Sequence, residues 1–293
     1  MSQVRPYLQL IRVPNLFTAM ADIMAGAWVA AGLAGSSPFS SQLIALIVSS
    51  TCLYAMGVVL NDYFDRHLDK MERPERPIPS GRISPAAALG LGIALGTAGV
   101  VAAAVVGMTS LALAVLTVAC ILLYDRYAKH HPVYGPITMG ICRGLNLLLG
   151  MSLVPEQLLA YWWLSVFGVL YISAVTLMAR GEVGPGSYPI RVRFVAAVIA
   201  LCSIGVLLIS TSAYQAVTLL AVVIFLIWTF SGVGPALKES TAPNIRGAVG
   251  KCIVALPLLD AAIAAPFGGW LAFASVVIFL VCSFSLAKLF AVT

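Results

Sequence analysis

Residues 42–82 read QLIALIVSSTCLYAMGVVLNDYFDRHLDKMERPERPIPSGR, and this stretch joins an apolar run to an acidic and then a basic segment. The run at 42–61 has about 20 predominantly apolar positions, which is the length that an α-helix needs to cross a bilayer. The charged residues that follow place the end of this helix at a membrane surface. The stretch therefore predicts a transmembrane helix that carries polar chemistry at one end.

The rest of the chain has the same apolar character. Of its 293 residues, 61% are hydrophobic and 10% are charged, whereas a soluble globular domain carries roughly 25% charged residues. We therefore expect residues 1–293 to form a single integral membrane domain, an all-α polytopic bundle of transmembrane helices. The candidate segments lie at 14–33, 42–61, 86–107, 109–125, 136–154, 160–179, 192–210, 214–233, 249–266 and 269–290.

The basic residues predict how these ten segments are oriented. They fall in alternate connections between the segments, and of 17 Lys and Arg residues only Arg143 lies deep within one. By the positive-inside rule, both termini and all the basic loops are cytoplasmic. The multi-pass protein is expected in a bacterial inner membrane. Because the net charge of +6 is spread over several short clusters, it does not indicate nucleic acid as a partner.

Four oxygen-bearing side chains follow the second apolar segment. If that helix continues past the membrane surface, each residue advances about 100° around its axis. Relative to Asn61, the side chains of Asp65, Asp69 and Asp62 then fall near about 40°, 80° and 100°, on one face. Three carboxylates so close repel one another unless a cation lies between them, and Mg²⁺ prefers oxygen ligands of this kind. The spacing therefore predicts a magnesium site.

A basic segment follows the acidic one directly. The guanidinium groups of Arg73, Arg76 and Arg82 are suited to binding phosphate bidentately. The prolines and the glycine within 74–81 end the helix and would fold this segment back as an ordered loop. Acid, metal and arginine together indicate a diphosphate site. The alternative is a solvated helix end that is stabilised by charge pairs four residues apart, such as Asp69 with Arg73.

The same residues resemble a known family. The pattern N-D-x-x-D-x-x-x-D at 61–69, with R-P at 76–77 and S-G at 80–81, resembles the first Asp-rich motif of the UbiA superfamily of intramembrane prenyltransferases. Residues 12–26 resemble the first helix of that superfamily, and residues 124–129 resemble the exit of its fourth helix.

The resemblance implies a bundle, commonly of nine helices, around a central cavity that opens to lipid. Members use Mg²⁺ to ionise a polyprenyl diphosphate and attach the prenyl group to an aromatic or other small acceptor. The catalytic residues carried over onto this chain are Asn61, Asp62, Asp65 and Asp69, of which Asn61, Asp65 and Asp69 are expected to bind the metal. Arg73, Arg76 and Lys129 are expected to bind the diphosphate.

The second Asp-rich motif of that superfamily is missing here. Its position reads TLMARGEVGPGSY at 176–188, where Glu182 is the only carboxylate. In one interpretation Arg180, Arg191 or Arg193 supplies the positive charge that a second metal would bring, and prenyl transfer is retained. In the other, the chain has lost catalysis and binds or moves an isoprenoid or an aromatic precursor.

The segment 176–182, together with L-L-D-A-A at 258–262, resembles the EboC-like branch of the superfamily. This resemblance does not define a reaction, and a tenth predicted helix departs from the common nine. A secondary transporter of unrelated fold would show matching interrupted helices in two halves of the chain. No half-to-half match is evident in the sequence.

Several polar residues lie inside predicted segments, where a charge at the bilayer centre costs about 2.5–3.5 kcal/mol and normally faces a cavity or a partner. Arg143 and Asn146 are three residues apart and share a helix face. They are expected to line the cavity with Asp22 and Glu182, with Arg143 binding phosphate or an acceptor carboxylate. The alternative is a structural ion pair of Arg143 with Asp22 or Asp260.

Two G-x-x-x-G pairs occur within apolar segments. Gly92 and Gly96 form the first pair, and Gly140 and Gly144 form the second. Small residues at this spacing let two transmembrane helices approach closely. We expect both pairs to be helix-packing contacts and not parts of a binding site.

Overall fold

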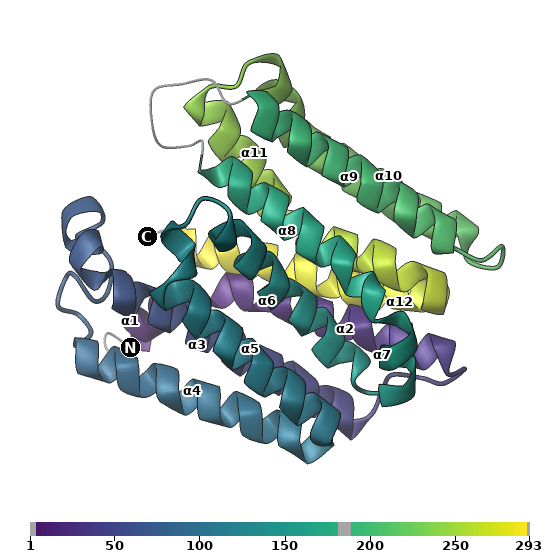
Figure 1. The fold of residues 1–293 in the computed structure, drawn as a ribbon, viewed down its shortest axis with the longest axis horizontal. Helices are drawn as coiled ribbons and strands as arrows, with labels where there is room; N and C mark the ends of the chain where they lie inside the picture. Colours follow the sequence, from purple (N-terminus) through teal and green to yellow (C-terminus); the bar gives the residue numbers. More distant parts are fainter. Residues whose placement is uncertain (1–3, 181–188, 292–293) are drawn as a thin grey trace.

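A computed structural model describes residues 4–180 and 189–291, with side chains described as far as residue 286, and the regular structure of these residues is helical (Figure 1). The elements in chain order are α1 (Val4–Leu10), α2 (Val13–Leu33), α3 (Ser41–Glu72), α4 (Pro85–Val106), α5 (Met108–Arg126), the 3₁₀-helix η1 (Ala128–His130), α6 (Tyr134–Met151), α7 (Pro155–Tyr161), the 3₁₀-helix η2 (Trp162–Leu164), α8 (Ser165–Ala179), α9 (Pro189–Ile209), α10 (Gln215–Lys238), α11 (Ala242–Val254) and α12 (Leu256–Ala291). The all-α prediction is confirmed.

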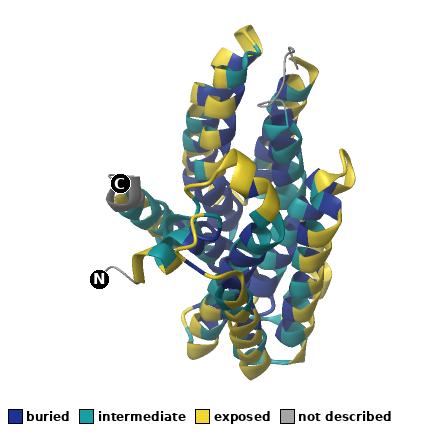
Figure 2. Cartoon of the chain, turned by 90° about the vertical axis from the view of Figure 1, so that its left-hand side faces the viewer, coloured by how far each residue is buried: buried dark blue, intermediate teal, exposed yellow. Residues whose placement is uncertain are grey.

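The outer faces of the bundle are apolar. Large hydrophobic side chains such as Val105 (76% exposed), Leu208 (81%) and Ile227 (67%) point away from the protein, and exposed residues follow the outward faces of the helices in Figure 2. In the described part of the chain, eight helices are long and apolar enough to cross a membrane. Lipid is the solvent that such surfaces require, so the chain is an integral, multi-pass membrane protein.

The C-terminal part of the chain departs from the predicted segments. A continuous helix at 249–266 is wrong, because α11 ends at Val254 and α12 begins at Leu256. The predicted break before 269 is confirmed, since Gly269 interrupts α12 with φ 59° and ψ −140°. This left-handed region favours glycine, which has no Cβ.

Contacts with α2 show how α12 reverses at this break. A Cβ on Gly32, near the end of α2, would meet the backbone of Phe267. Further along α12, the Ser283 hydroxyl donates to the Pro14 carbonyl at 2.8 Å, near the start of α2. The second arm of α12 therefore runs antiparallel to α2 along most of its length.

Helix α2 lies at the centre of the bundle. Its main neighbours are α12, α6 and α3. Of the most apolar 18-residue stretch of α2, 78% is buried inside the protein. Gly26 lies against the Leu147 carbonyl of α6, and Gly150 of α6 lies against the Ile23 carbonyl of α2. Two glycines, one from each helix, thus bring the two backbones into direct contact.

The predicted glycine packing is confirmed. Gly92 and Gly96 of α4 face α3, where a Cβ on Gly96 would meet the Met56 sulfur. Gly140 and Gly144 of α6 face α8 in the same way. These close contacts draw α4 to α3 and α8 to α6.

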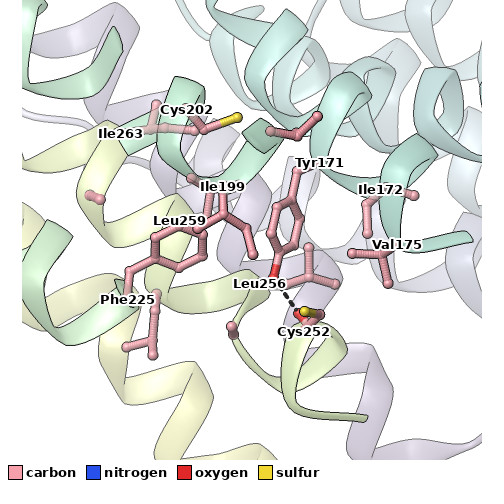
Figure 3. Close-up of a cluster of buried hydrophobic side chains, with 14 of the residues drawn as sticks. Tyr171, Ile172, Val175, Ile199, Cys202, Phe225, Cys252, Leu256, Leu259 and Ile263 are labelled. Atoms are coloured by element: carbon pink, nitrogen blue, oxygen red, sulfur yellow. Dashed lines mark hydrogen bonds between the residues drawn. The ribbon is translucent and has the colours of Figure 1, made fainter. Parts of the chain in front are cut away.

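A second core lies among α8, α9, α10 and α11 (Figure 3). The Tyr171 hydroxyl donates to the Cys252 carbonyl at 2.8 Å, which satisfies its one polar group inside an apolar cluster. The Tyr171 and Phe225 rings lie 5.6 Å apart between centroids. This packing fixes α8 and α11, which form one wall of the cavity described below.

Helix α3 is longer than a bilayer requires. Its 32 residues span about 48 Å at about 1.5 Å per residue, against a hydrocarbon core of about 30 Å. The acidic residues therefore lie on an extension beyond the apolar part of the helix, as predicted. The loop that follows is ordered, because Ile78 and Ile83 are buried with Leu10 and Val59.

Candidate functional site

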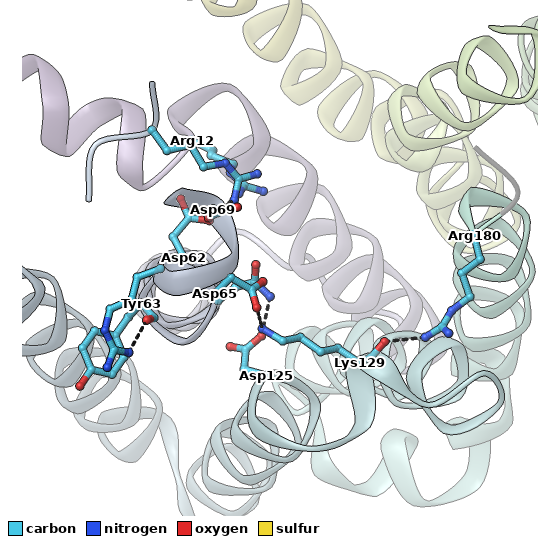
Figure 4. Close-up of polar contacts among 11 residues, drawn as sticks. Arg12, Asp62, Tyr63, Asp65, Asp69, Asp125, Lys129 and Arg180 are labelled. Atoms are coloured by element: carbon cyan, nitrogen blue, oxygen red, sulfur yellow. Dashed lines mark hydrogen bonds and ion pairs between the residues drawn. The ribbon is translucent and has the colours of Figure 1, made fainter. Parts of the chain in front are cut away.

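The acidic extension of α3 meets the ends of several other helices at one end of the bundle (Figure 4). Arg12 immediately precedes α2, Asp125 lies in the last turn of α5, and Lys129 lies in η1. The loop after α3 folds back, as predicted, and returns Arg76 to the helix it has left. Charged groups that are far apart in the sequence therefore share one region.

Two of the predicted carboxylates are held by arginines. Arg76 Nη1 lies 2.8 Å from Asp69 Oδ2 and 3.2 Å from Asp62 Oδ1. Arg12 Nη2 lies 2.8 Å from the same oxygen of Asp62. Both carboxylates are buried, so each needs such a counter-charge. We call Asp62 and Asp69 the arginine-held pair.

Arg12 reaches Asp62 from a strained backbone. Its φ of 50° and ψ of 57° make it the one non-glycine residue with positive φ in the described part of the chain. The left-handed region costs an ordinary residue roughly 1–2 kcal/mol. Arg12 was not predicted as a site residue, although the position of Pro14 two residues later was a local signal of a turn there.

The other two predicted residues face α5. Asn61 Nδ2 donates to Asp125 Oδ1 at 3.0 Å, and Lys129 Nζ lies 2.5 Å from Asp65 Oδ1. The Lys129 ammonium lies between Asp65 and Asp125 in Figure 4. We call Asn61, Asp65, Asp125 and Lys129 the Asp125 cluster. Asp125 was not predicted as a site residue, although its place four residues before Lys129 in a polar helix end was a signal.

The predicted single face of four oxygen ligands is therefore divided. Asp69 was expected to bind metal beside Asn61 and Asp65, but its carboxylate is bound by Arg76. A helical wheel gives only the angle of each side chain, and partners from other helices decide which way it turns.

The charge pairs of the alternative interpretation do not form either. Arg66 is four residues after Asp62, but its guanidinium donates to the Tyr63 carbonyl and stacks on the Tyr63 ring. Arg73, a predicted diphosphate ligand, is exposed, and Asp69 binds Arg76 instead of Arg73. The end of α3 is thus not an ordinary solvated helix end.

Arg180 has a different role from the predicted contact with diphosphate. It caps the end of α8, and its Nη2 donates to the Lys129 carbonyl at 2.5 Å. The guanidinium therefore holds the segment that carries Lys129. Glu182, expected near the cavity, lies outside the residues that the structure describes.

A cavity of about 450 Å³ leads from this region into the bundle, within the range of about 300–1,000 Å³ that is common for ligand sites. Asn61, Asp125 and Arg12 line it where it meets the charged region. The rest of its lining surface is mostly apolar, with polar groups from α2, α3, α5 and α6. The lining residues include Asp22, Ser50, Leu53, Tyr54, Thr117, Ile121, Tyr124, Met139, Arg143, Asn146, Ile172, Val175, Val249, Ile253 and Leu256.

The buried polar residues of the membrane segments form one network at this cavity. Arg143 Nη2 lies 2.7 Å from Asp22 Oδ1 and 2.8 Å from Asp260 Oδ2. Asn146 donates to Asp22 Oδ2 at 2.7 Å and accepts from the Ser50 hydroxyl at 2.7 Å. We call Asp22, Arg143 and Asp260 the buried triad.

The triad corrects the expectation that Arg143 binds phosphate or an acceptor carboxylate. Its guanidinium faces two carboxylates, so it has no uncompensated positive charge to offer. The structural alternative named Asp22 or Asp260, and the structure has both. Asp22 and Asn146 line the cavity as expected.

The oxygen donors present fit one kind of Mg²⁺ site, an open site with only two carboxylate ligands. No group of three His, Cys, Asp or Glu side chains that could enclose a metal occurs within the described residues. Mg²⁺ usually needs only one or two carboxylates and completes its shell with water and substrate phosphates. Two oxygen donors are suited to such an open site: the partly exposed Asp65, and the buried Asp125 Oδ2, which has no hydrogen-bond partner among the described residues.

Comparison with known proteins identifies the family. Residues 23–182, more than half of the chain, match the model of the UbiA prenyltransferase family. The chain belongs to this family. The predicted resemblance is thereby confirmed at family level, whereas membership of the EboC-like branch stays a prediction.

Relatives within the UbiA family come from archaea. The digeranylgeranylglyceryl phosphate synthase of Methanothrix thermoacetophila is 35% identical over 164 residues, which are 56% of this chain and 60% of that protein. The enzyme of the same name from Natronomonas pharaonis is 29% identical over 180 residues, which are 61% and 62% of the two chains. The chain thus spans about 60% of the length of these relatives.

Solved structures show the same UbiA fold. A UbiA homologue from Archaeoglobus fulgidus bound to GPP and Mg²⁺ matches with a TM-score of 0.65 and 16% identity, over 88% of this chain and 99% of that one. The apo structure of a homologue from Aeropyrum pernix K1 matches with a TM-score of 0.59 and 19% identity, over 85% and 96%.

Proposed function

We propose that this chain is a Mg²⁺-dependent intramembrane prenyltransferase that transfers a prenyl group from a polyprenyl diphosphate to a small acceptor. The observation that carries the proposal is the junction of two environments. The arginines, the Lys129 ammonium and the carboxylates gather where a mostly apolar cavity opens. A polyprenyl diphosphate has the same division between a charged head and an apolar tail.

The residues take the following roles in this proposal. Asn61 and Asp65 hold Mg²⁺, and Lys129 and Arg12 bind the diphosphate. Arg76 keeps the arginine-held pair in place and stabilises the loop beside the site. Bound Mg²⁺ would supply Lewis-acid stabilisation of the negative charge on the leaving diphosphate.

The reaction exchanges one bond at the prenyl carbon. The bond from this carbon to the diphosphate oxygen breaks, and its electrons stay with the diphosphate. A nucleophilic atom of the acceptor bonds to the same carbon and releases its proton. The apolar lining, with residues such as Leu53 and Ile121, keeps water from the cationic prenyl group.

The acceptor is one of two classes. The resemblance implies an aromatic or other small acceptor, and the names of the relatives indicate a glyceryl phosphate. We favour the glyceryl phosphate class, because its phosphate would find cations at the mouth of the cavity. An aromatic carboxylate deeper in the cavity would meet the compensated Arg143 of the buried triad.

The proposal also includes an orientation. The basic loops favour a cytoplasmic location for the site and both termini, and a polyprenyl diphosphate would enter with its tail in the lipid. A bacterial inner membrane stays the predicted host membrane.

A second candidate function is a membrane carrier or binding protein for an isoprenoid or aromatic precursor. The observation that favours it is the absence of aspartate at 176–188. Arg180, one proposed substitute for the second metal, donates to a backbone carbonyl. A carrier needs only to bind the diphosphate, whereas an enzyme must also release it.

One experiment separates the two functions. The purified protein in lipid is given labelled geranylgeranyl diphosphate, Mg²⁺ and a panel of prenylated glyceryl phosphate and aromatic acceptors. Diphosphate release that requires Mg²⁺ and falls at least 100-fold in Asp65→Asn supports the enzyme, and the labelled product names the acceptor class. Mg²⁺-dependent binding without release supports the carrier.

A further inference from the structure

Asp125 stands out because one of its oxygens is buried without a partner. The residue lies in the last turn of α5, is 3% exposed and lines the cavity. Asn61 donates to Oδ1, while Oδ2 has no hydrogen-bond partner among the described residues. Leaving a buried polar atom unsatisfied costs about 1–3 kcal/mol, more for a charged group, so such an oxygen calls for an explanation.

The positive charge near Asp125 is the Lys129 ammonium, which is paired with Asp65. The Lys129 side chain is buried (8% exposed), and its Nζ makes an ion pair with Asp65 but no hydrogen bond of normal geometry within the described structure. This one ammonium is the cation of the Asp125 cluster, which contains two carboxylates. The cluster therefore has net charge −1 when both carboxylates are ionised, and it lacks a second positive charge.

The arginine-held pair does not share this deficit. Arg76 bridges Asp62 and Asp69, and Arg12 adds a second contact to Asp62. These carboxylates are already neutralised by side chains. The oxygens that can take a further cation are therefore on Asp65 and Asp125, from two different helices.

We propose that Asp125 is the second carboxylate ligand of the Mg²⁺ bound at Asp65, with the Asn61 amide orienting its carboxylate from the other oxygen. The inference rests on the proposed function, because it needs a diphosphate and Mg²⁺ at this site. With Mg²⁺ bound, the Lys129 ammonium would be released from Asp65 and would be available to the diphosphate. A carboxylate on α5 thus replaces the aspartates that the sequence lacks at 176–188.

The arrangement matches known preferences of the ion. One or two carboxylates, water and substrate phosphates are the usual shell of Mg²⁺. A hydrogen bond to the second oxygen of a ligating carboxylate is the usual outer support, and its loss typically lowers metal affinity 10- to 100-fold. The contact of Asn61 with Asp125 Oδ1 leaves Oδ2 directed to the metal.

The test measures metal binding directly. Mn²⁺ replaces Mg²⁺, and the EPR signal of free Mn²⁺ is titrated against purified protein with a non-hydrolysable geranylgeranyl thiodiphosphate. We expect Asp125→Asn to bind Mn²⁺ at least 10-fold more weakly than the wild type. Glu75→Gln removes an exposed carboxylate from the loop after α3, and its Mn²⁺ affinity is expected to stay within twofold of the wild type.

A second variant covers the case in which Asp125→Asn does not fold. Asp125→Cys places a thiolate at the proposed ligand position, so its preference should shift from Mn²⁺ toward Cd²⁺ by at least 10-fold. A purely structural Asp125 would change stability without changing metal preference.

The outcomes distinguish this inference from the function on which it rests. If the wild type binds Mn²⁺ with the thiodiphosphate and Asp125→Asn binds it equally well, the inference is overturned and the proposed function stands. If the wild type itself binds no Mn²⁺, both are overturned. An unchanged metal preference in Asp125→Cys also overturns the inference.

Discussion

Arg143 gives the most demanding test of how charge is balanced inside the bundle. Its side chain is 9% exposed and lies 2.7 Å from Asp22 and 2.8 Å from Asp260. Arg143→Met keeps an unbranched side chain but removes the counter-charge of two buried carboxylates at once. Breaking a buried ion pair from one side costs about 3–5 kcal/mol, and we expect a loss of this size.

This loss of stability corresponds to a decrease in the melting temperature, Tm. An unfolding entropy of about 2.1 cal/mol/K per residue amounts to about 0.6 kcal/mol/K for the 293-residue chain. Arg143→Met should therefore lower the Tm by about 5–8 °C. Thermal unfolding in detergent micelles can be followed with a thiol-reactive dye, because buried free cysteines such as Cys202 and Cys252 become accessible on unfolding.

The control removes all the charges of the triad together. Replacing a buried ionic group by neutral residues of similar volume is often neutral or stabilising. The triple variant Asp22→Asn, Arg143→Met, Asp260→Asn should therefore recover most of the lost Tm. If Arg143→Met melts within 1 °C of the wild type, the argument from unpaired charge is refuted.

Two further predictions concern packing and metal. Gly150→Ala places a Cβ against the Ile23 backbone and should destabilise the protein by about 1–3 kcal/mol. Its control is Gly247→Ala, in open space on α11, which should stabilise the protein by up to about 1 kcal/mol. Equal Tm values for the two variants would contradict the close contact of α2 and α6. Lys129→Met leaves the Asp125 cluster without its ammonium and should therefore bind Mg²⁺ more tightly than the wild type does. At a Mg²⁺ concentration of about 100 times the variant's Kd, binding should add about 2.7 kcal/mol of stability to the variant, and the same concentration should raise the Tm of the wild type less. Tm values measured with and without Mg²⁺ check this, and an equal rise in both proteins would speak against it.

Local patterns predicted much of the bundle. The helices follow the apolar runs, and the glycine pairs at 92 and 96 and at 140 and 144 pack as expected. The loop at 74–84 folds back because proline and glycine end α3 and because its two isoleucines have an apolar place to pack. Each of these features depends on residues that are close together in the sequence.

The candidate site was predicted only in part. The stretch 61–69 was identified, but its division between two sets of partners depends on Arg12 and Asp125, which are about 50 and 64 residues away. No local rule says which helix end will face α3. The same limit applies to Arg143, whose possible partners were named but whose simultaneous contact with both depends on how α2, α6 and α12 pack together.

The buried triad also has a consequence for the order in which the bundle is assembled in the membrane. Its members are residues 22, 143 and 260, so they leave the ribosome one after another, each separated from the next by more than 100 residues of synthesis. Helix α2 has a mean hydropathy of only 1.5, against 2.6 for α9, and it enters the bilayer before its arginine exists. A chain that stops before α12 keeps a hydrophobic exterior but lacks Asp260. The ionic network of the bundle is therefore incomplete until the first arm of α12 has been made, and until then Arg143 has one of its two carboxylate partners.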